Sequence, residues 1–336
     1  MRFGLGAIKG VGEGVLEKIF AERDSNGPYS DLIDLCHRTS SVGVSRGVLE
    51  GLIRAGALDC LGENRPTLMS NLPLALGAAS QQSRNRDSGQ TDLFGDVTAT
   101  DDPAIEVVRV KDWPDIERLM AERKTTGRFF SGHPIDPYLG ELEKITSGRI
   151  VEQCNRVPQD DGGFRSRGQD CVMAGLICDI RVRATNRGAR LLTATLDDCT
   201  GKTDVVVSGD LLESSGHKLA ADSVVVVEGS LGIDSFSGGY SLRARQVYSM
   251  DEARERFARL LLVTWRSTDE SASLQRIQEA LASHRKGGRL PVFIDYANES
   301  ATARIRLGED WLINPSTQLI DSLNSAAGVS NVDLVY

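Results

Sequence analysis

The sequence predicts an α+β protein of several domains, and three observations lead to that prediction. Residues 1–79 show helical spacing of apolar side chains broken by glycines, whereas residues 170–250 show the alternation typical of strands. From residue 259 onward, strand-like and helix-like runs alternate along the chain. A chain of 336 residues is also long enough for two or three domains rather than one.

Changes in composition divide the chain into five parts. The run at 80–102 is polar and almost free of apolar residues, which is typical of a flexible linker. We expect a helical domain over 1–79, a linker over 80–102, a helical connector over 103–169, a strand-rich barrel over 170–250 and a small mixed domain over 251–336.

Charge and hydropathy exclude some functional classes. The chain holds 39 Lys and Arg against 47 Asp and Glu, a net charge of −8, which argues against a surface covered throughout by nucleic acid. Local basic patches remain possible at this balance. No run approaches the roughly 20 apolar residues of a membrane span, and the first residues lack the apolar core of a signal peptide. We therefore expect a cytoplasmic protein.

The first helical region contains a glycine hairpin between two helices. Gly10-Val11-Gly12 interrupts a helical pattern that resumes with apolar residues on one face. The glycines permit a tight turn and let a phosphate approach the N–H groups where the next helix starts. Lys9 and Lys18 add positive charge. The pattern is that of a helix-hairpin-helix, and it predicts duplex-binding residues at Lys9, Gly10, Val11, Gly12 and Lys18.

A second helical pair follows in the run VLEGLIRAGALDCLG, with an Ala-Gly-Ala turn between its helices. Two such units in tandem form a compact module that grips the backbone of duplex DNA. The alternative is a plain pair of antiparallel helices with glycine at a cap, and the second pair weakens it. In the connector, WPDIERLMAERKTTGRFF predicts a helix, which is followed by a break at Gly132-His133-Pro134 and a short helix from Asp136.

The strand-rich region predicts a five-stranded barrel. The expected strands cover 171–184, 190–197, 203–208, 223–233 and 241–249. A short helix at about 210–219 separates the third strand from the fourth, which is the mark of an OB-fold.

OB-folds bind single strands with the loops between strands one and two and between strands four and five. Here the first loop is rich in arginine and the second offers aromatic side chains, with Arg243 and Arg245 behind them. This combination suits a groove that follows a nucleic-acid backbone and stacks its bases. The predicted single-strand-binding residues are Arg181, Arg183, Arg187, Arg190, Phe236 and Tyr240. The alternative is an OB-fold used only as a spacer or protein dock.

The last domain has the order β-α-β-β-α-β. Its expected strands and helices cover 259–265, 271–284, 290–296, 303–307, 316–326 and 331–335. This order predicts a small split-βαβ sheet with two helices on one face. The domain carries no motif for chemistry, so it is expected to hold a protein partner.

Catalytic and metal-binding patterns are missing from the sequence. The adjacent carboxylates Asp101-Asp102 and Asp197-Asp198 fit turns better than a two-metal centre. No P-loop, G-x-S-x-G, H-E-x-x-H or dinucleotide-binding fingerprint is present. Six scattered cysteines without a C-x-x-C pair suit buried thiols in a reducing compartment. We expect no catalytic residue, no metal site and no cofactor in this chain.

Seven short segments, in order along the chain, carry a resemblance to a known family. FGLGAIKGVGEG, VLEGLIRAGALDCLG, QTDLFG, GRFFSGHPIDPYL and the set AGLI, LDDCTG and FSGG resemble the C-terminal part of bacterial replicative DNA polymerase III alpha subunits. The resemblance runs over the whole chain. It implies that the polymerase active site, with its catalytic aspartates, lies in a part of the family not present here. The chain is then a fragment, inactive alone in nucleotidyl transfer.

The resemblance also implies partners for each part. The tandem helix-hairpin-helix corresponds to the duplex-binding element, and the OB-fold to the one that contacts single-stranded template. A short run resembles the internal motif that binds the sliding clamp, its residues being Gln90, Asp92, Leu93 and Phe94. The C-terminal domain resembles the part that docks the clamp-loader tau subunit, with no individual residues implied.

Two other readings of the sequence stay open. The same two modules could build a free-standing DNA-repair or junction-binding protein, which would bind duplex without affinity for a clamp. The net charge of −8 also suits a protein scaffold that contacts no DNA.

Overall fold

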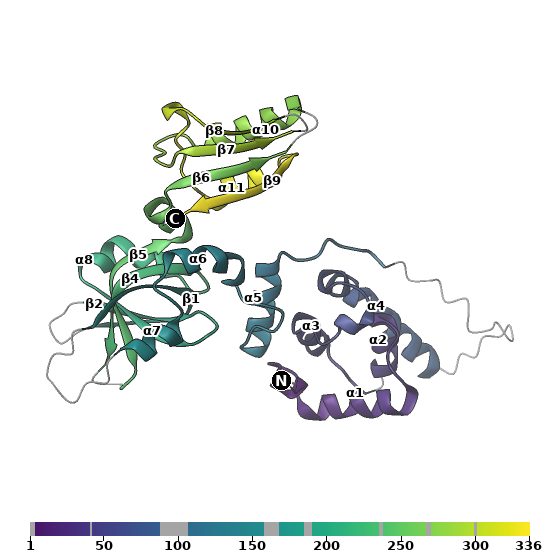
Figure 1. Cartoon of the computed structure of the whole chain (residues 1–336). Coiled ribbons are helices and arrows are strands. Elements are labelled where there is room, and N and C mark those ends of the chain that lie inside the picture. Colours follow the sequence, from purple (N-terminus) through teal and green to yellow (C-terminus); the bar gives the residue numbers. More distant parts are fainter. Residues whose placement is uncertain are drawn as a thin grey trace. The chain divides into compact units, whose positions relative to one another are not determined.

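A computed structural model describes residues 4–40, 42–87, 107–157, 168–184, 190–234, 238–266, 270–298 and 301–336. The chain divides into two compact units, residues 1–134 (unit 1) and 135–336 (unit 2) (Figure 1). Unit 1 is helical, and unit 2 holds a closed barrel and a mixed sheet. The predicted α+β class is therefore confirmed. No helix among the described residues is long and apolar enough to cross a membrane.

Unit 1 is a cluster of helices around one apolar core. Its elements are η1 (Leu5–Ala7), α1 (Glu13–Asn26), α2 (Leu32–Ser40), α3 (Arg46–Arg54), η2 (Asp59–Leu61), α4 (Arg65–Asp87) and α5 (Asp115–Thr126). Leu49 and Ile53 of α3 are fully buried, and Leu72 of α4 is 1% exposed. Together they form the centre on which α1 and α2 pack.

Helix α4 reaches further than the sequence predicts. It continues to Asp87, so residues 80–87 are helical rather than part of the expected linker. The first part of α4 is fixed by Leu68, Leu72, Ala75 and Ala79, which recur on one face of the helix and are buried in the core. Adding residues to a helix that is already formed requires no new nucleus, so a polar run can extend it.

The second helical pair also differs from its prediction. The Ala-Gly-Ala turn is present, with Gly56 at φ +77°. It leads into the short η2 and then α4, rather than directly into a helix.

An extended segment after residue 106 lies along α4. The side chain of Asn71 bonds the Val108 backbone twice: its Nδ2 donates to the carbonyl at 2.9 Å and its Oδ1 accepts from the N–H at 3.0 Å. Two residues on, the Val110 N–H donates to Thr67 Oγ1 at 3.0 Å. These side chains of α4 take the place that a neighbouring strand would occupy in a sheet.

The barrel of unit 2 is built as the sequence predicts. Its strands are β1 (Gln169–Ala184), β2 (Arg190–Asp197), β3 (Lys202–Ser208), β4 (Val224–Ile233) and β5 (Tyr240–Ser249). They close in the order β1-β2-β3-β5-β4, and α8 (Asp210–Ser215) with η4 (Gly216–Lys218) lies between β3 and β4. The OB-fold is confirmed. The interior is apolar and includes Met173, Leu196 and Val205, each fully buried.

Short helices flank the barrel. They are η3 (Asp136–Tyr138), α6 (Leu139–Ile145), α7 (Ile150–Arg156) and α9 (Met250–Phe257). Asp198, 2% exposed, joins α7 to the β2–β3 turn: it accepts from the Ile150 N–H at 2.8 Å and from the Thr200 N–H at 2.9 Å. Its role is structural, as predicted for a carboxylate at that turn.

The C-terminal sheet has an order that the sequence prediction missed. Its elements are β6 (Leu260–Trp265), α10 (Glu270–Ser283), β7 (Val292–Ala297), β8 (Thr302–Arg306), η5 (Glu309–Trp311), α11 (Thr317–Asn324) and β9 (Val329–Val335). The strand order is β8-β7-β6-β9, and β6 pairs directly with β7 in parallel. No strand separates them, so the expected split βαβ arrangement is wrong. Helices α10 and α11 pack together over the same core.

Candidate nucleic-acid interface

The predicted hairpin at Gly10-Val11-Gly12 is present in unit 1. Gly10 has φ +81°, a conformation that a side chain would strain. The side chains of Ile8 and Val11 are 5% and 6% exposed and anchor the hairpin in the core. Gly51 of α3 lies beneath it, because a Cβ there would be 3.5 Å from both of these side chains.

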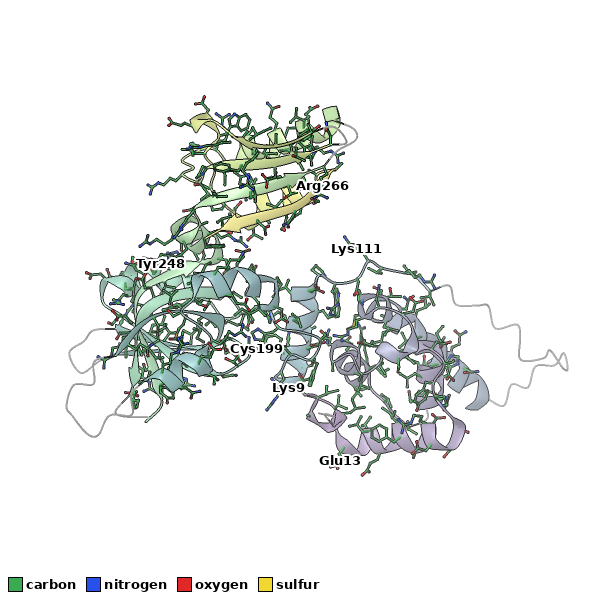
Figure 2. The ribbon with its side chains drawn as sticks, in the orientation of Figure 1. Lys9, Glu13, Lys111, Cys199, Tyr248 and Arg266 are labelled. Carbon is green, nitrogen blue, oxygen red and sulfur yellow. The ribbon has the colours of Figure 1, made fainter. Side chains whose placement is uncertain are left out.

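The start of α1 is open for an anion. Gly12 occupies the N-cap position and no side chain caps the helix. The first N–H groups of a helix lack partners within the helix and carry its positive dipole end, so they suit a phosphate oxygen. Lys9 and Glu13 are exposed on either side of the hairpin (Figure 2). Lys9 adds positive charge to this anion site, whereas the carboxylate of Glu13 opposes it.

Lys18 does not join the first hairpin. Its Nζ donates to the carbonyl of Val42 at 3.4 Å, in the connection between α2 and α3. Its charge therefore lies beside another turn of the chain.

That turn is a second hairpin, which the sequence analysis missed. Gly43 has φ +73°, close to Gly10, and Ser45 caps α3 with φ −78° and ψ 155°. Gly12 caps α1 with φ −77° and ψ 145°. The signal was present in the sequence, since GVGEG at 10–14 recurs as GVSRG at 43–47. The Ser at the third position hid the repeat, and the prediction placed the second turn after α3 instead of before it.

The two hairpins differ in charge. Where the first has Glu13 at the start of its helix, the second has Arg46. Arg46 Nε pairs with Glu50 Oε1 at 2.8 Å and remains 63% exposed. With Lys18 close to Val42, the second hairpin brings together two cations around the start of α3.

The barrel carries a groove of about 520 Å³ across its strands. Three of the predicted residues line it: Arg181, Arg183 and Tyr240. Arg190 is exposed but is not part of the lining. Arg187 and Phe236 lie outside the described residues.

A row of paired residues crosses the groove from β1 to β4. It consists of Arg181, Thr193, Val206, Arg243 and Ser230, each paired with the next in the sheet register. An arginine therefore lies toward each end of the row, with small and apolar side chains between them. Such a row can hold phosphates at its ends and bases at its centre.

The arginines near the groove are not equivalent. Arg181 Nε pairs with Asp179 at 2.8 Å, and Arg245 pairs with Asp170 at 2.9 Å outside the lining. Arg243 lines the groove directly. From the sequence, Arg243 is expected only behind the aromatic side chains, because the strand register is needed to bring it opposite Arg181.

The remaining predicted sites are not seen. Gln90, Asp92, Leu93 and Phe94 lie outside the described residues. Among the residues that the structure does describe, no group of three His, Cys, Asp or Glu side chains could hold a metal ion.

Family models match three separate parts of the chain. A model described as "Helix-hairpin-helix motif" matches residues 1–68, and "OB-fold nucleic acid binding domain" matches residues 172–249. A third, "DNA polymerase III subunit alpha, C-terminal domain", matches residues 276–328. The first two correspond to the two parts that carry the hairpins and the groove.

Curated relatives match over nearly the whole chain. DNA polymerase III subunit alpha of Escherichia coli O157:H7 is 39% identical over 338 residues, covering 99% of this chain and 28% of the relative. The protein of the same name from Pasteurella multocida is 36% identical over 335 residues, with the same coverage. That of Pseudomonas aeruginosa is 36% identical over 354 residues, covering 99% of this chain and 29% of the relative. The chain thus spans less than a third of the length of these relatives.

Proposed function

The chain is a homologue of the C-terminal region of DNA polymerase III alpha subunits, and on that premise we propose that it binds the DNA and the protein partners of a replicating polymerase. We also propose that nucleotidyl transfer belongs to a part of such a polymerase outside this chain. The observation that carries the proposal is the repeated hairpin, GVGEG and GVSRG, with each copy at the start of a helix.

Duplex DNA is the ligand proposed for the two hairpins. Each offers main-chain N–H groups at a helix start, and such contacts go to phosphate oxygens rather than to base edges. Binding should therefore be independent of sequence. It should also weaken steeply with salt, because each phosphate contact releases counterions.

Single-stranded template is the ligand proposed for the groove of the barrel. Arg181, Arg183 and Arg243 supply charge along the groove, and Tyr240 supplies a face for stacking a base. The arginines of this groove lie among polar and small apolar side chains such as Thr193 and Val206. This composition supports binding of a nucleic-acid backbone rather than of a protein, because a protein-binding surface would need a more apolar centre.

Two protein partners complete the proposal. The sliding clamp is proposed to bind at Gln90, Asp92, Leu93 and Phe94, and the clamp-loader tau subunit at the C-terminal domain. Both rest on the resemblance of the sequence to its family and on the homology above. A bacterial replication protein of this kind would work in the cytoplasm. A free-standing repair protein is less well supported, since homology to one polymerase subunit extends over 99% of the chain.

A titration of labelled DNA tests the proposal. The full chain is added to a fluorescein-labelled primer–template at 50, 100 and 200 mM KCl, and anisotropy gives the affinity at each salt. We expect the logarithm of the binding constant to fall linearly with the logarithm of salt, by about 0.9 for each duplex phosphate contacted. Absence of binding at 50 mM KCl would support the scaffold reading instead.

A further inference from the structure

The C-terminal end of α5 lies against the first hairpin. The backbone N–H of Lys9 donates to the carbonyl of Thr125, in the last turn of α5, at 2.8 Å. Helix α5 is outside the segment that the helix-hairpin-helix model matches, which ends at residue 68. The hairpin thus has a neighbour that is separate from its own repeat.

That neighbour is strongly basic. The last turn of α5 carries Arg123 and Lys124, and Arg128 follows directly after the helix. Lys124 and Arg128 are exposed, as is Lys9, whose backbone N–H binds the same turn of α5. Several cations of unit 1 pair with carboxylates, among them Arg38, Arg46, Arg54, Arg65, Arg109 and Arg118. Lys9 and Lys124 are not members of these pairs.

The charge has a physical consequence for the hairpin. The C-terminal end of a helix presents partial negative charge, which would repel a phosphate held at the hairpin beside it. The positive charges of Lys124 and Arg128 outweigh this partial negative charge, so the local charge beside the hairpin becomes positive. If these cations served only to stabilise the C-terminal end of α5, they would be expected in its last turn. Lys124 lies there, but Arg128 lies beyond the end of the helix.

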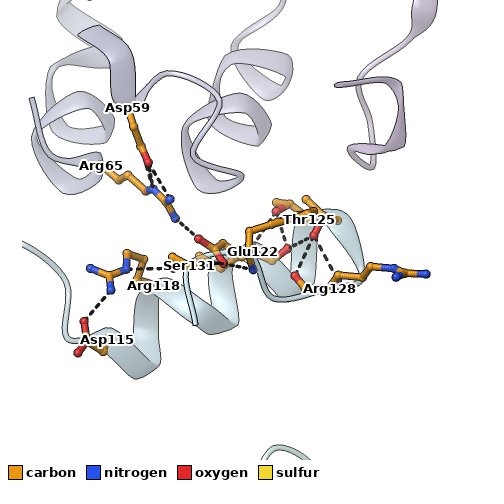
Figure 3. Close-up of polar contacts among 11 residues, drawn as sticks. Asp59, Arg65, Asp115, Arg118, Glu122, Thr125, Arg128 and Ser131 are labelled. Atoms are coloured by element: carbon orange, nitrogen blue, oxygen red, sulfur yellow. Dashed lines mark hydrogen bonds and ion pairs between the residues drawn. The ribbon is translucent and has the colours of Figure 1, made fainter. Parts of the chain in front are cut away.

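A buried carboxylate fixes the path of the chain around Arg128. Glu122 is fully buried, and its Oε2 accepts from the N–H groups of Phe130 and Ser131 at 2.7 and 3.0 Å. Its Oε1 accepts from Arg65 at 2.9 Å (Figure 3). The Arg128 side chain points away from this network, as Figure 3 shows. Residues 127–131 are therefore held in a defined shape, with Arg128 directed outward.

We propose that Lys124 and Arg128 form a second wall of the duplex site, binding phosphates next to the one held at Gly10-Val11-Gly12. The proposal rests on the duplex binding proposed above and adds an element outside the hairpin repeat. Glu122 is a positioning residue for this wall, because it shapes the backbone that carries Arg128. The ligand is the sugar–phosphate backbone of a duplex, without preference for sequence.

The test compares two double variants of the full chain. Lys124→Ala/Arg128→Ala removes the proposed wall. Arg109→Ala/Lys111→Ala removes the same charge from exposed positions on the extended segment, and Figure 2 shows Lys111 away from Lys9, on the segment that precedes α5. Each protein is titrated into a fluorescein-labelled 20-base-pair duplex at 50, 100 and 200 mM KCl. Thermal unfolding of each variant checks that it is folded.

For the wall variant we expect the salt slope to become shallower by about 1.8, or 0.9 for each lost phosphate contact. The affinity should fall on the order of 10- to 100-fold at 100 mM KCl, since two such contacts are lost. The control variant should keep the wild-type slope. If both variants change the slope equally, the wall does not exist, although duplex binding by the hairpins stands. If the wild-type chain does not bind duplex at 50 mM KCl, both proposals are overturned.

Discussion

Glu122 is a carboxylate in the interior of unit 1, and its partners decide its charge. Burial alone would raise the pKa of its carboxyl group. The N–H groups of Phe130 and Ser131 and the guanidinium of Arg65 outweigh that effect, so the pKa lies below its ordinary value. Arg65 also pairs with Asp59 at 2.8 Å, which leaves the buried cation doubly compensated.

This network makes the stability of unit 1 depend on pH. Because the folded pKa of Glu122 is depressed, its contribution is present above the unfolded pKa and is lost as the pH falls through the folded value. Glu122→Gln should cost about 3 kcal/mol, the lower end for breaking a buried pair, since Asp59 still compensates Arg65. Hydrogen exchange of α4 and α5 amides at pH 7 and pH 4 measures both effects.

The matched control is Glu117→Gln, the same change on an exposed residue of α5. It should alter stability by less than about 0.5 kcal/mol. Equal effects of the two substitutions would mean that the Glu122 network does not stabilise unit 1.

In the barrel, two arginines on β5 provide a matched pair. Arg243 lines the groove, whereas Arg245 pairs with Asp170 outside it. Arg243→Ala should weaken binding of a labelled 15-nucleotide oligothymidine, and should make the salt slope shallower by about 0.7 for the lost contact. Arg245→Ala should leave both unchanged. An equal loss of affinity in the two variants would mean that the overall positive charge of the barrel, rather than the groove, binds the oligothymidine.

The clamp motif offers a third test on single side chains. An apolar pair filling a pocket typically contributes about 2–4 kcal/mol per residue to binding. Leu93→Ala/Phe94→Ala in the full chain should therefore abolish capture on immobilised clamp. Duplex affinity should not change, because the motif is separate from the hairpins in sequence. Retained capture would remove the clamp assignment.

Among the elements of unit 1, one hairpin could be predicted from the sequence and the other could not. Gly10-Val11-Gly12 was found because two glycines in three residues are a strong turn signal. The second hairpin was missed because Ser45 replaces the second glycine, although the backbone angles at the two helix starts are close. Serine is itself a favoured N-cap: Ser45 Oγ accepts from the Val48 N–H at 3.4 Å, a bond that Gly12 cannot make at the first hairpin.

A substitution at each hairpin tests whether both bind DNA. Gly10→Val and Gly43→Val place a β-branched side chain at φ +81° and +73°, where it is strained and obstructs the approach of a phosphate. Each should lower duplex affinity about tenfold, the effect of about 1.4 kcal/mol. Gly62→Val is the control: it sits at φ +84° with open space around it, outside either hairpin. A loss of affinity in the control as well would show that strain, not phosphate access, is responsible.

Sheets were harder to predict than helices. The order of strands and helices in the C-terminal domain was expected, yet the direct pairing of β6 with β7 was not. A β-α-β connection can place its second strand next to the first or one position further, and hydrophobic alternation is the same in both cases. The closed barrel was easier, since the helix between β3 and β4 is itself a signal for one topology.

For the molecule as a whole, a buried ion cluster joins the barrel to the C-terminal domain in unit 2. Arg254 of α9 is 3% exposed and binds Glu141 of α6 through two nitrogens at 2.7 and 2.8 Å. It also donates to Thr317 of α11 at 2.7 Å, and the Tyr336 hydroxyl donates to Glu141 at 2.9 Å. Burial and the nearby Glu141 raise the pKa of the Tyr336 phenol, which keeps it protonated as the donor.

Loss of this cluster should uncouple the two domains. Arg254→Met leaves the charge of Glu141 without its partner, and should destabilise unit 2 by about 3–5 kcal/mol. Arg256→Met, an exposed neighbour on α9, should have little effect. Calorimetry measures this effect. For Arg254→Met, we expect unit 2 to unfold in two separate transitions. A single unchanged transition would contradict the structural role of the cluster.

The cluster also affects how the tau assignment is tested. Deleting residues 259–336 removes Thr317 and Tyr336 from the cluster along with the C-terminal sheet. Loss of tau binding in gel filtration is still expected, but Arg254→Met serves as the control for damage to the barrel. Tau that remains bound to the shortened chain would contradict the assignment.

One chain is proposed to bind DNA and the clamp at the same time, and a single titration tests this. Labelled primer–template is titrated with the full chain at 100 mM KCl, with and without clamp loaded on the DNA. Two linked contacts should raise the apparent affinity by about 100-fold or more, and Leu93→Ala/Phe94→Ala should return it to the value without clamp. An affinity that is the same with and without clamp, in a chain that binds the DNA, would contradict the claim.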